Sequence, residues 1–315
     1  MLKRLQKQID KKLQLPPVVT NSIPAQVSLE HKTWRRFFRN RQAVLGMVML
    51  AIIVLCVIFV PFFYTTPINK IDFAASTLPP SWAHPFGTND LGQDILARIL
   101  YGGRISIAIG IFSTLVTICL GTLIGAISGF YGGWIDIILM RFTDLCLALP
   151  RLPLLLLIIF LFRDSLKAIA GAELGIFVLI VLLIGGLNWM SVGRLVRAGF
   201  LTVRELEFVT AARALGASPR RLIWVHIFPN VISPVLVAGT LSVSTAILTE
   251  STLSFLGLGF PPDVPTWGRM LYDAQNFLQF APYMVIFPGT AIFLTVLSIN
   301  YIGDGLRDAL DPRLL

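Results

Sequence analysis

The chain alternates between long apolar stretches and short segments that carry most of its charged residues. Five stretches are free of charged side chains for at least the roughly 20 residues that an α-helix needs to cross a hydrocarbon core. They predict membrane-spanning helices over residues 43–64, 105–128, 174–193, 231–255 and 283–303. Because lipid offers the backbone no hydrogen-bond partners, helices are the expected form of these spans.

A sixth candidate span, residues 135–162, is largely apolar but is interrupted by charges and prolines. Pro150 and Pro153 predict a kink or a break within it. Topology favours counting it as a span. With six spans, the arginine-rich segment 201–230 lies on the same side of the membrane as the basic N-terminal arm, as the positive-inside rule requires. We therefore expect an all-α, polytopic membrane protein with six transmembrane helices and both termini in the cytoplasm.

Composition agrees with this pattern and excludes other classes of protein. Hydrophobic residues make up 55% of the 315 residues and charged residues only 14%, against roughly 25% charged in soluble domains. A soluble fold of this size could not bury so much apolar surface, and a disordered chain would be far more polar. The net charge of +9 is concentrated near the N-terminus, which favours an anionic membrane surface over nucleic acid. Residues 1–42 predict a cytoplasmic amphipathic segment.

The sequence lacks the motifs that would make this chain an enzyme. No lysine follows a Gly-x-x-x-x-Gly stretch, so the phosphate-binding loop of ATPases is missing. Neither His-Glu-x-x-His nor Gly-x-Ser-x-Gly occurs. If ATP drives the protein, we expect a separate subunit to hydrolyse it.

The segment 201–230 predicts two short helices that meet at a glycine turn. Strong helix formers precede Gly216, which is a good helix stop, and Ser218 followed by Pro219 is a typical helix start. The small residues Ala211 and Ala212 would allow another protein to approach closely. The residues alone leave two interpretations open: a docking helix, or an interfacial helix that covers its own bundle.

This segment resembles the EAA loop of ABC-importer permeases. Thr210-Ala-Ala, three residues, Gly216, nine residues and His226-Ile-Phe-Pro229 follow the spacing of that loop, with Thr210 where glutamate is usual. Residues His84–Ser106 and Thr249–Gly268 resemble the C-type permease subunit of dipeptide/oligopeptide (and nickel) importers. The resemblance extends from about Trp34 to Pro312.

The resemblance implies an ABC importer type I permease in a prokaryotic inner membrane. It implies an extracytoplasmic loop over 65–104, a permease core over 105–303 with the coupling loop 201–230, and a cytoplasmic tail over 304–315. The implied partners are a second homologous permease, two P-loop ATPase subunits or domains and an extracytoplasmic solute-binding protein. ATP and Mg would bind the ATPases, and this chain would bind no cofactor. The implied coupling residues are Glu207, Thr210, Ala211, Ala212, Arg213, Gly216 and Pro229.

Four intramembrane charges are candidates for either the pathway or a structural role: Asp136, Arg141, Asp144 and Glu250. Arg141 and Asp144 are three residues apart, which predicts a pair on one helix face. Glu250 could contact substrate or make a structural contact. The leading hypothesis is a permease for di- or oligopeptides, with nickel or another small solute as the alternative cargo. A self-sufficient ion-coupled transporter and a membrane scaffold are the competing classes.

Overall fold

The computed structural model describes residues 34–310, which form helices joined by loops, without a β-strand in that range. Residues 34–39 are helical. The named elements after them are α3 (Arg41–Phe63), η1 (Phe73–Ala75), α4 (Ile95–Tyr131), α5 (Gly133–Ala148), α6 (Arg151–Ala170), α7 (Ala172–Val203), α8 (Glu207–Ala214), α9 (Pro219–Arg221), η2 (Leu222–Ile227), α10 (Phe228–Phe255), α11 (Trp267–Ala274), η3 (Gln275–Phe277) and α12 (Tyr283–Leu310). The all-α prediction is confirmed for this part of the chain.

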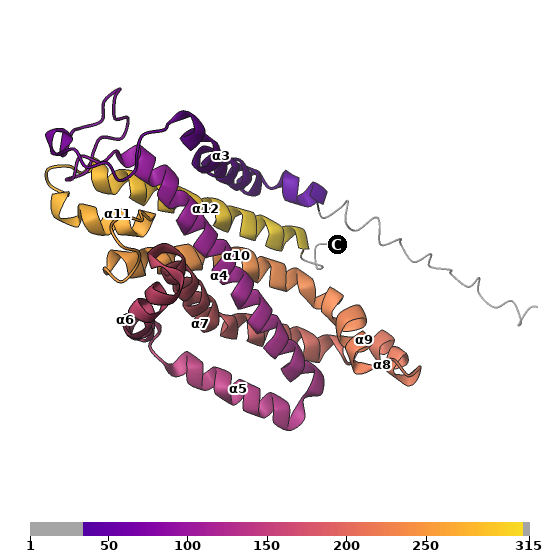
Figure 1. Ribbon diagram of the computed structural model, residues 1–315. Coiled ribbons are helices and arrows are strands. Elements are labelled where there is room, and N and C mark those ends of the chain that lie inside the picture. Colours follow the sequence, from indigo (N-terminus) through magenta and orange to yellow (C-terminus); the bar gives the residue numbers. More distant parts are fainter. Residues whose placement is uncertain (1–33, 311–315) are drawn as a thin grey trace, which may run out of the picture.

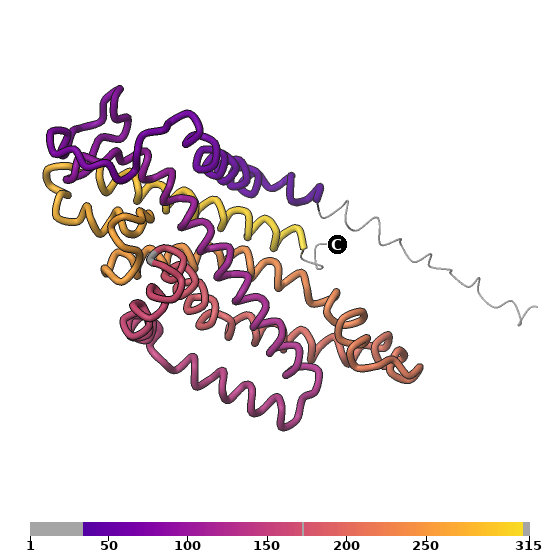
Figure 2. Tube along the Cα trace, in the orientation of Figure 1, coloured from indigo at the N-terminus to yellow at the C-terminus, as the bar shows by residue number. Residues whose placement is uncertain are grey.

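The long helices form a bundle with two distinct ends (Figure 1). Five helices are long and apolar enough to cross a membrane: α3, α4, α7, the run from α9 through α10, and α12. Helices α5 and α6 qualify only as a pair, and they are bent by 86° at their junction. In Figure 2 this bend lies at the lower left, where the helix that runs along the lower edge of the molecule ends and the next one begins. The prediction of six spans therefore holds only if this bent pair counts as one.

Several helices extend beyond the predicted spans, because charged residues do not end them. Helix α4 begins at Ile95, ten residues before the predicted span, since Asp94 caps it and Arg98 is buried inside it. The Arg98 guanidinium donates to Gln93 Oε1 at 2.7 Å and to the Pro262 carbonyl at 3.0 Å. Helix α12 likewise continues to Leu310, through most of the predicted tail.

Most of the predicted N-terminal amphipathic segment, residues 1–33, lies outside the described residues. Residues 34–43 pack against the other end of the chain. Phe37 is buried beside Ala43 and Ala309, and Asn40 Nδ2 donates to Asp308 Oδ2 at 3.2 Å. Helices α3 and α12 consequently run side by side along one edge of the bundle (Figure 1).

Glycines allow α4 and α7 to pack closely. A Cβ atom at Gly121 would lie 2.7 Å from Val192 Cβ, and one at Gly129 would lie 2.6 Å from Phe200 Cβ. No real Cβ tolerates such distances, so only glycine permits this separation between the two helices. The α4–α7 contact forms the centre of the bundle and joins its two ends.

Replacing Gly121 with alanine is expected to destabilise the bundle, since the methyl group would collide with α7. Overpacking of this kind costs about 1–3 kcal/mol. Gly186→Ala is the matched control, because its added Cβ would meet no atom within 4 Å among the described residues, apart from its chain neighbours and the nearby backbone of its own helix, and alanine favours helix. Thermal unfolding in detergent should show a lower midpoint for Gly121→Ala and no loss for Gly186→Ala. Equal midpoints would contradict the close-packing interpretation.

Candidate coupling surface and intramembrane charges

The predicted two-helix turn forms, and its geometry explains the residues found there. Helix α8 ends in a Schellman motif: Gly216 N–H donates to the Arg213 carbonyl at 3.0 Å, and Ala217 N–H donates to the Ala212 carbonyl at 3.1 Å. Gly216 has φ +84°, a conformation that side chains with a Cβ rarely adopt. Ser218 then starts the next helix, with Pro219 as its first residue, so the predicted start is confirmed.

The second helix of the pair is not short, contrary to the prediction. It continues through the π-helical η2 into α10 and ends at Phe255. Phe228 N–H donates to the Ile223 carbonyl, five residues earlier. Pro229, which lacks an N–H, lies just after this π turn, inside the continuous helix. Pro229 therefore lies at the start of α10, within one continuous helix, and does not mark the end of the coupling loop.

Helix α8 is fixed to the bundle through one buried side chain. Val209 is fully buried and packs in a cluster with Phe200 of α7 and with Leu222, Ile227 and Val231 of the run into α10. Arg204, just before α8, donates to the Gly129 carbonyl at the end of α4 at 2.9 Å. A force applied to α8 would therefore act on α7 and α10 together.

Most of the predicted coupling residues of α8 and its turn are exposed. They are Glu207, Thr210, Ala211 and Arg213, with Gly216 at the turn, while Ala212 is half-buried. Glu207 and Ala211 lie on the face opposite Val209, whereas Arg213 follows Val209 by one turn on the same face. We call these six residues the coupling surface. Thr210 Oγ1 donates to the Glu207 carbonyl at 2.8 Å, so this hydroxyl bonds its own helix. Pro229 is exposed but belongs to the base of α10.

Two of the four predicted intramembrane charges, Asp136 and Asp144, pair with arginines of another helix, and the predicted Arg141–Asp144 pair is wrong. Asp144 accepts from Arg194 Nη2 at 2.5 Å, and Asp136 accepts from Arg197 Nε at 2.5 Å and Nη2 at 2.6 Å. Asp136 also accepts from the Ser128 hydroxyl. Arg141 is exposed. The two acids of α5 are therefore joined to two arginines one turn apart on α7, a pairing that local spacing alone does not reveal.

Reversing the Asp136–Arg197 pair tests whether it holds α5 against α7. Asp136→Arg alone should destabilise the protein, because it places like charges together near the membrane. Adding Arg197→Asp should restore most of the thermal midpoint, since the pair re-forms with opposite polarity. The single Arg197→Asp variant completes the double-mutant cycle. Additive losses in the double variant would contradict the pairing.

Glu250 lies in a buried network of hydrogen bonds. It is fully buried and accepts from Ser254 Oγ at 2.7 Å and Ser106 Oγ at 3.3 Å. Ser106 also accepts from Trp267 N–H at 3.3 Å, and the Trp267 indole donates to the Ile99 carbonyl at 3.0 Å. This network joins α4, α10 and α11, which favours the structural interpretation of Glu250 over a substrate contact.

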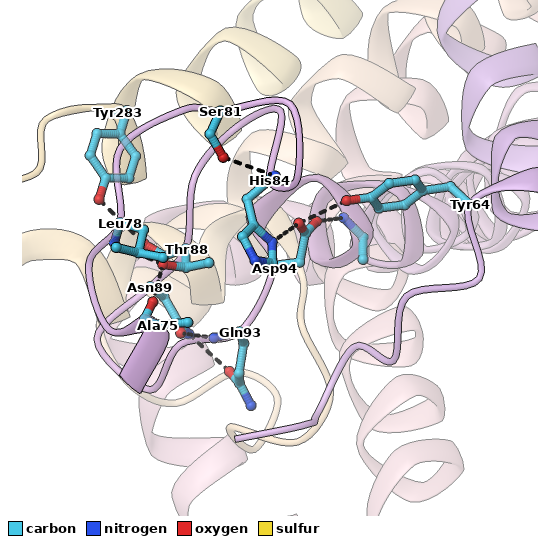
Figure 3. A network of polar contacts seen from close by, with 11 residues as sticks. Tyr64, Ala75, Leu78, Ser81, His84, Thr88, Asn89, Gln93, Asp94 and Tyr283 are labelled. Carbon is cyan, nitrogen blue, oxygen red and sulfur yellow. Dashed lines mark hydrogen bonds and ion pairs between the residues drawn. The ribbon is translucent and has the colours of Figure 1, made fainter. Parts of the chain in front are cut away.

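A second polar network orders the loop between α3 and α4 at the other end of the bundle (Figure 3). Asp94 Oδ2 accepts from Tyr64 OH at 2.8 Å and lies 2.8 Å from His84 Nδ1, while Oδ1 accepts from Ala97 N–H. No sequence motif predicts this network, since Tyr64 and Asp94 are 30 positions apart.

Comparison with known proteins places this arrangement in a family. Residues 121–315 match the model of the binding-protein-dependent transport system inner membrane component, and residues 28–80 match that of the N-terminal TM domain of oligopeptide transport permease C. The dipeptide transport system permease protein DppC of Alkalihalophilus pseudofirmus is 40% identical over 289 residues, covering 89% of this chain and 90% of that protein. The oligopeptide transport system permease protein OppC of Bacillus subtilis is 38% identical over 288 residues, covering 91% of each.

A solved structure has the same fold. The MetNI methionine ABC transporter in inward-facing conformations aligns with a TM-score of 0.50 at 15% identity, covering 69% of this chain and 97% of that one. The resemblance inferred from the motifs is confirmed by a family model that covers more than half of the chain and by relatives of similar length. The chain belongs to the family of inner membrane components of binding-protein-dependent transport systems.

Proposed function

We propose that this chain is one of two permease subunits that form the pathway of an ATP-driven importer for di- or oligopeptides. A solute-binding protein would deliver the peptide at the end of the bundle that carries the loop between α3 and α4. Two ATPase subunits would bind ATP and Mg²⁺ and dock at the other end, with this chain binding no nucleotide. The names of the relatives, dipeptide and oligopeptide permeases, support the substrate class.

One observation carries the coupling part of this proposal: α8 presents a small-residue face outward while its buried Val209 locks it to α7 and α10. A groove on an ATPase could receive that face, because Ala211 offers no bulk. Closure of the ATPases would then displace α8, and α7 and α10 would move with it. Such movement would alternate access to the pathway. This assignment places α8 and both chain termini in the cytoplasm.

Reconstitution tests the proposal directly. The tagged full-length chain is purified gently, its co-purifying proteins are identified by mass spectrometry, and the complex is placed in vesicles with its binding protein. We expect a second permease and P-loop ATPases to co-purify, and labelled di- and tripeptides to enter only with ATP. Uptake of Ni²⁺ instead of peptide would reassign the cargo. Uptake by the chain alone, driven by a proton gradient, would overturn the importer assignment.

A further inference from the structure

A cavity of about 260 Å³ opens where the start of α6, the middle of α7 and the last third of α10 meet. Its polar lining consists of Arg151, Asn188, Thr249 and Thr252, and aliphatic side chains from the same three helices complete the walls. Complete ligand pockets usually measure roughly 300–1,000 Å³, so this one suits one end of a larger molecule.

The cavity lies at membrane depth and at a broken span. Asn188 is near the middle of α7, and Arg151 is the first residue after the 86° bend between α5 and α6. Non-helical backbone and charged side chains at such depth are tolerated only against protein or a water-filled cavity. The position therefore fits a polar pathway better than a lipid-facing surface.

Arg151 keeps most of its hydrogen-bonding capacity free. Within residues 34–310 its guanidinium makes one hydrogen bond, from Nη1 to Asn188 Oδ1 at 3.2 Å, and no carboxylate in that range pairs with it. By contrast, Arg194 and Arg197 on α7 are both in ion pairs. A guanidinium has five N–H donors in a planar fork that matches a carboxylate. The exposed Arg151 side chain therefore offers most of this fork to a molecule in the cavity.

The threonines supply the complementary acceptors. Thr249 Oγ1 donates to the Thr245 carbonyl at 2.7 Å, and Thr252 Oγ1 donates to the Leu248 carbonyl at 2.8 Å. Each hydroxyl has thereby used its only proton within α10, and its oxygen can only accept from a molecule in the cavity. The cavity thus combines a cationic donor, Arg151, with two neutral acceptors.

We propose that this cavity binds the C-terminal carboxylate of a peptide in transit. Arg151 would bind the carboxylate, and Thr249 or Thr252 would accept the N–H of the last peptide bond. This inference rests on the proposed peptide import and adds to it a subsite within the membrane. The ligand class is a peptide with a free C-terminal carboxylate.

The test compares tri-alanine with tri-alanine amide, which differ in the charge of that terminus. ATP-driven uptake of each is measured in vesicles that contain the complete transporter with wild-type chain, Arg151→Gln or Arg151→Lys. Arg163→Gln is the matched control, because Arg163 lies on α6 outside the cavity. Preferences of the binding protein cancel, because the acid-to-amide ratio of each variant is divided by that of the wild type.

Arg151→Gln should lower uptake of the acid by about tenfold and leave the amide within about twofold, as expected for loss of one charge-assisted contact. Arg151→Lys should retain an intermediate ratio, and Arg163→Gln should retain the wild-type ratio. If Arg151→Gln fails to assemble, Asn188→Leu is used, and a reduced acid-to-amide ratio is again expected. Equal losses for acid and amide, or no loss, would overturn the inference. Absence of ATP-driven peptide uptake by the wild type would instead overturn the proposed function.

Discussion

ATP-driven uptake should fall at least tenfold when Ala211 is replaced by tryptophan, while the chain itself stays folded. Ala211 is exposed on the face of α8 opposite the buried Val209. An indole there would hold a docking surface apart without disturbing the cluster beneath the helix. Loss of about 1.4 kcal/mol of docking free energy already weakens binding tenfold. Vesicle uptake and the amount of co-purified ATPase measure the effect.

The control for this variant is Ala211→Ser, which stays small and should retain uptake. A normal thermal midpoint for the tryptophan variant separates lost docking from lost folding. Full uptake with tryptophan at this position would show that α8 is not the docking surface. The ATPases would then have to dock on other residues at that end of the bundle.

Replacing Glu250 with leucine should destabilise the protein by about 3 kcal/mol, because the buried Ser106 and Ser254 hydroxyls lose their shared acceptor. We expect the thermal midpoint in detergent to fall by roughly 5–10 °C. We expect this loss of stability to be large because the Glu250 carboxylate links α10 to α4 and, through Ser106, to α11.

Glu250→Gln is the companion variant. The serines donate to different carboxylate oxygens of Glu250. In the amide, the oxygen can still accept from one serine and the NH2 group can donate to the hydroxyl oxygen of the other, so most of the stability should remain. If both variants lose peptide transport while keeping the wild-type midpoint, Glu250 would act in the pathway and not in the fold. The combination of midpoint and uptake therefore decides between the two roles.

Local chemistry explains which features could be predicted from the sequence. The glycine turn at Gly216 and the helix start at Ser218–Pro219 depend on residues only a few positions apart, and both predictions are confirmed. The apolar stretches likewise identify the spans, because length and composition are properties of the stretch itself. The family could be predicted because the segment from Thr210 to Pro229 keeps the residue spacing of the EAA loop.

Features that depend on distant residues could not be predicted in the same way. Asp144 pairs with Arg194, which is 50 residues away, and not with its helical neighbour Arg141. Arg98 is charged and is therefore expected to lie outside the span that follows it. It is instead buried within α4, where Gln93 and the distant Pro262 carbonyl accept its hydrogen bonds. The Arg151 cavity combines three helices that no sequence pattern connects.

The ion pairs between α5 and α7 also constrain how the protein is made. Asp136 leaves the ribosome 61 residues before Arg197 does, a delay of about 3–12 s at about 5–20 residues per second. During that interval the acids of α5 have no arginine partners from α7, and an unpaired charge in lipid is unfavourable. We therefore expect α5 and α6 to wait at the membrane surface or beside the insertion machinery, and to enter the bilayer together with α7.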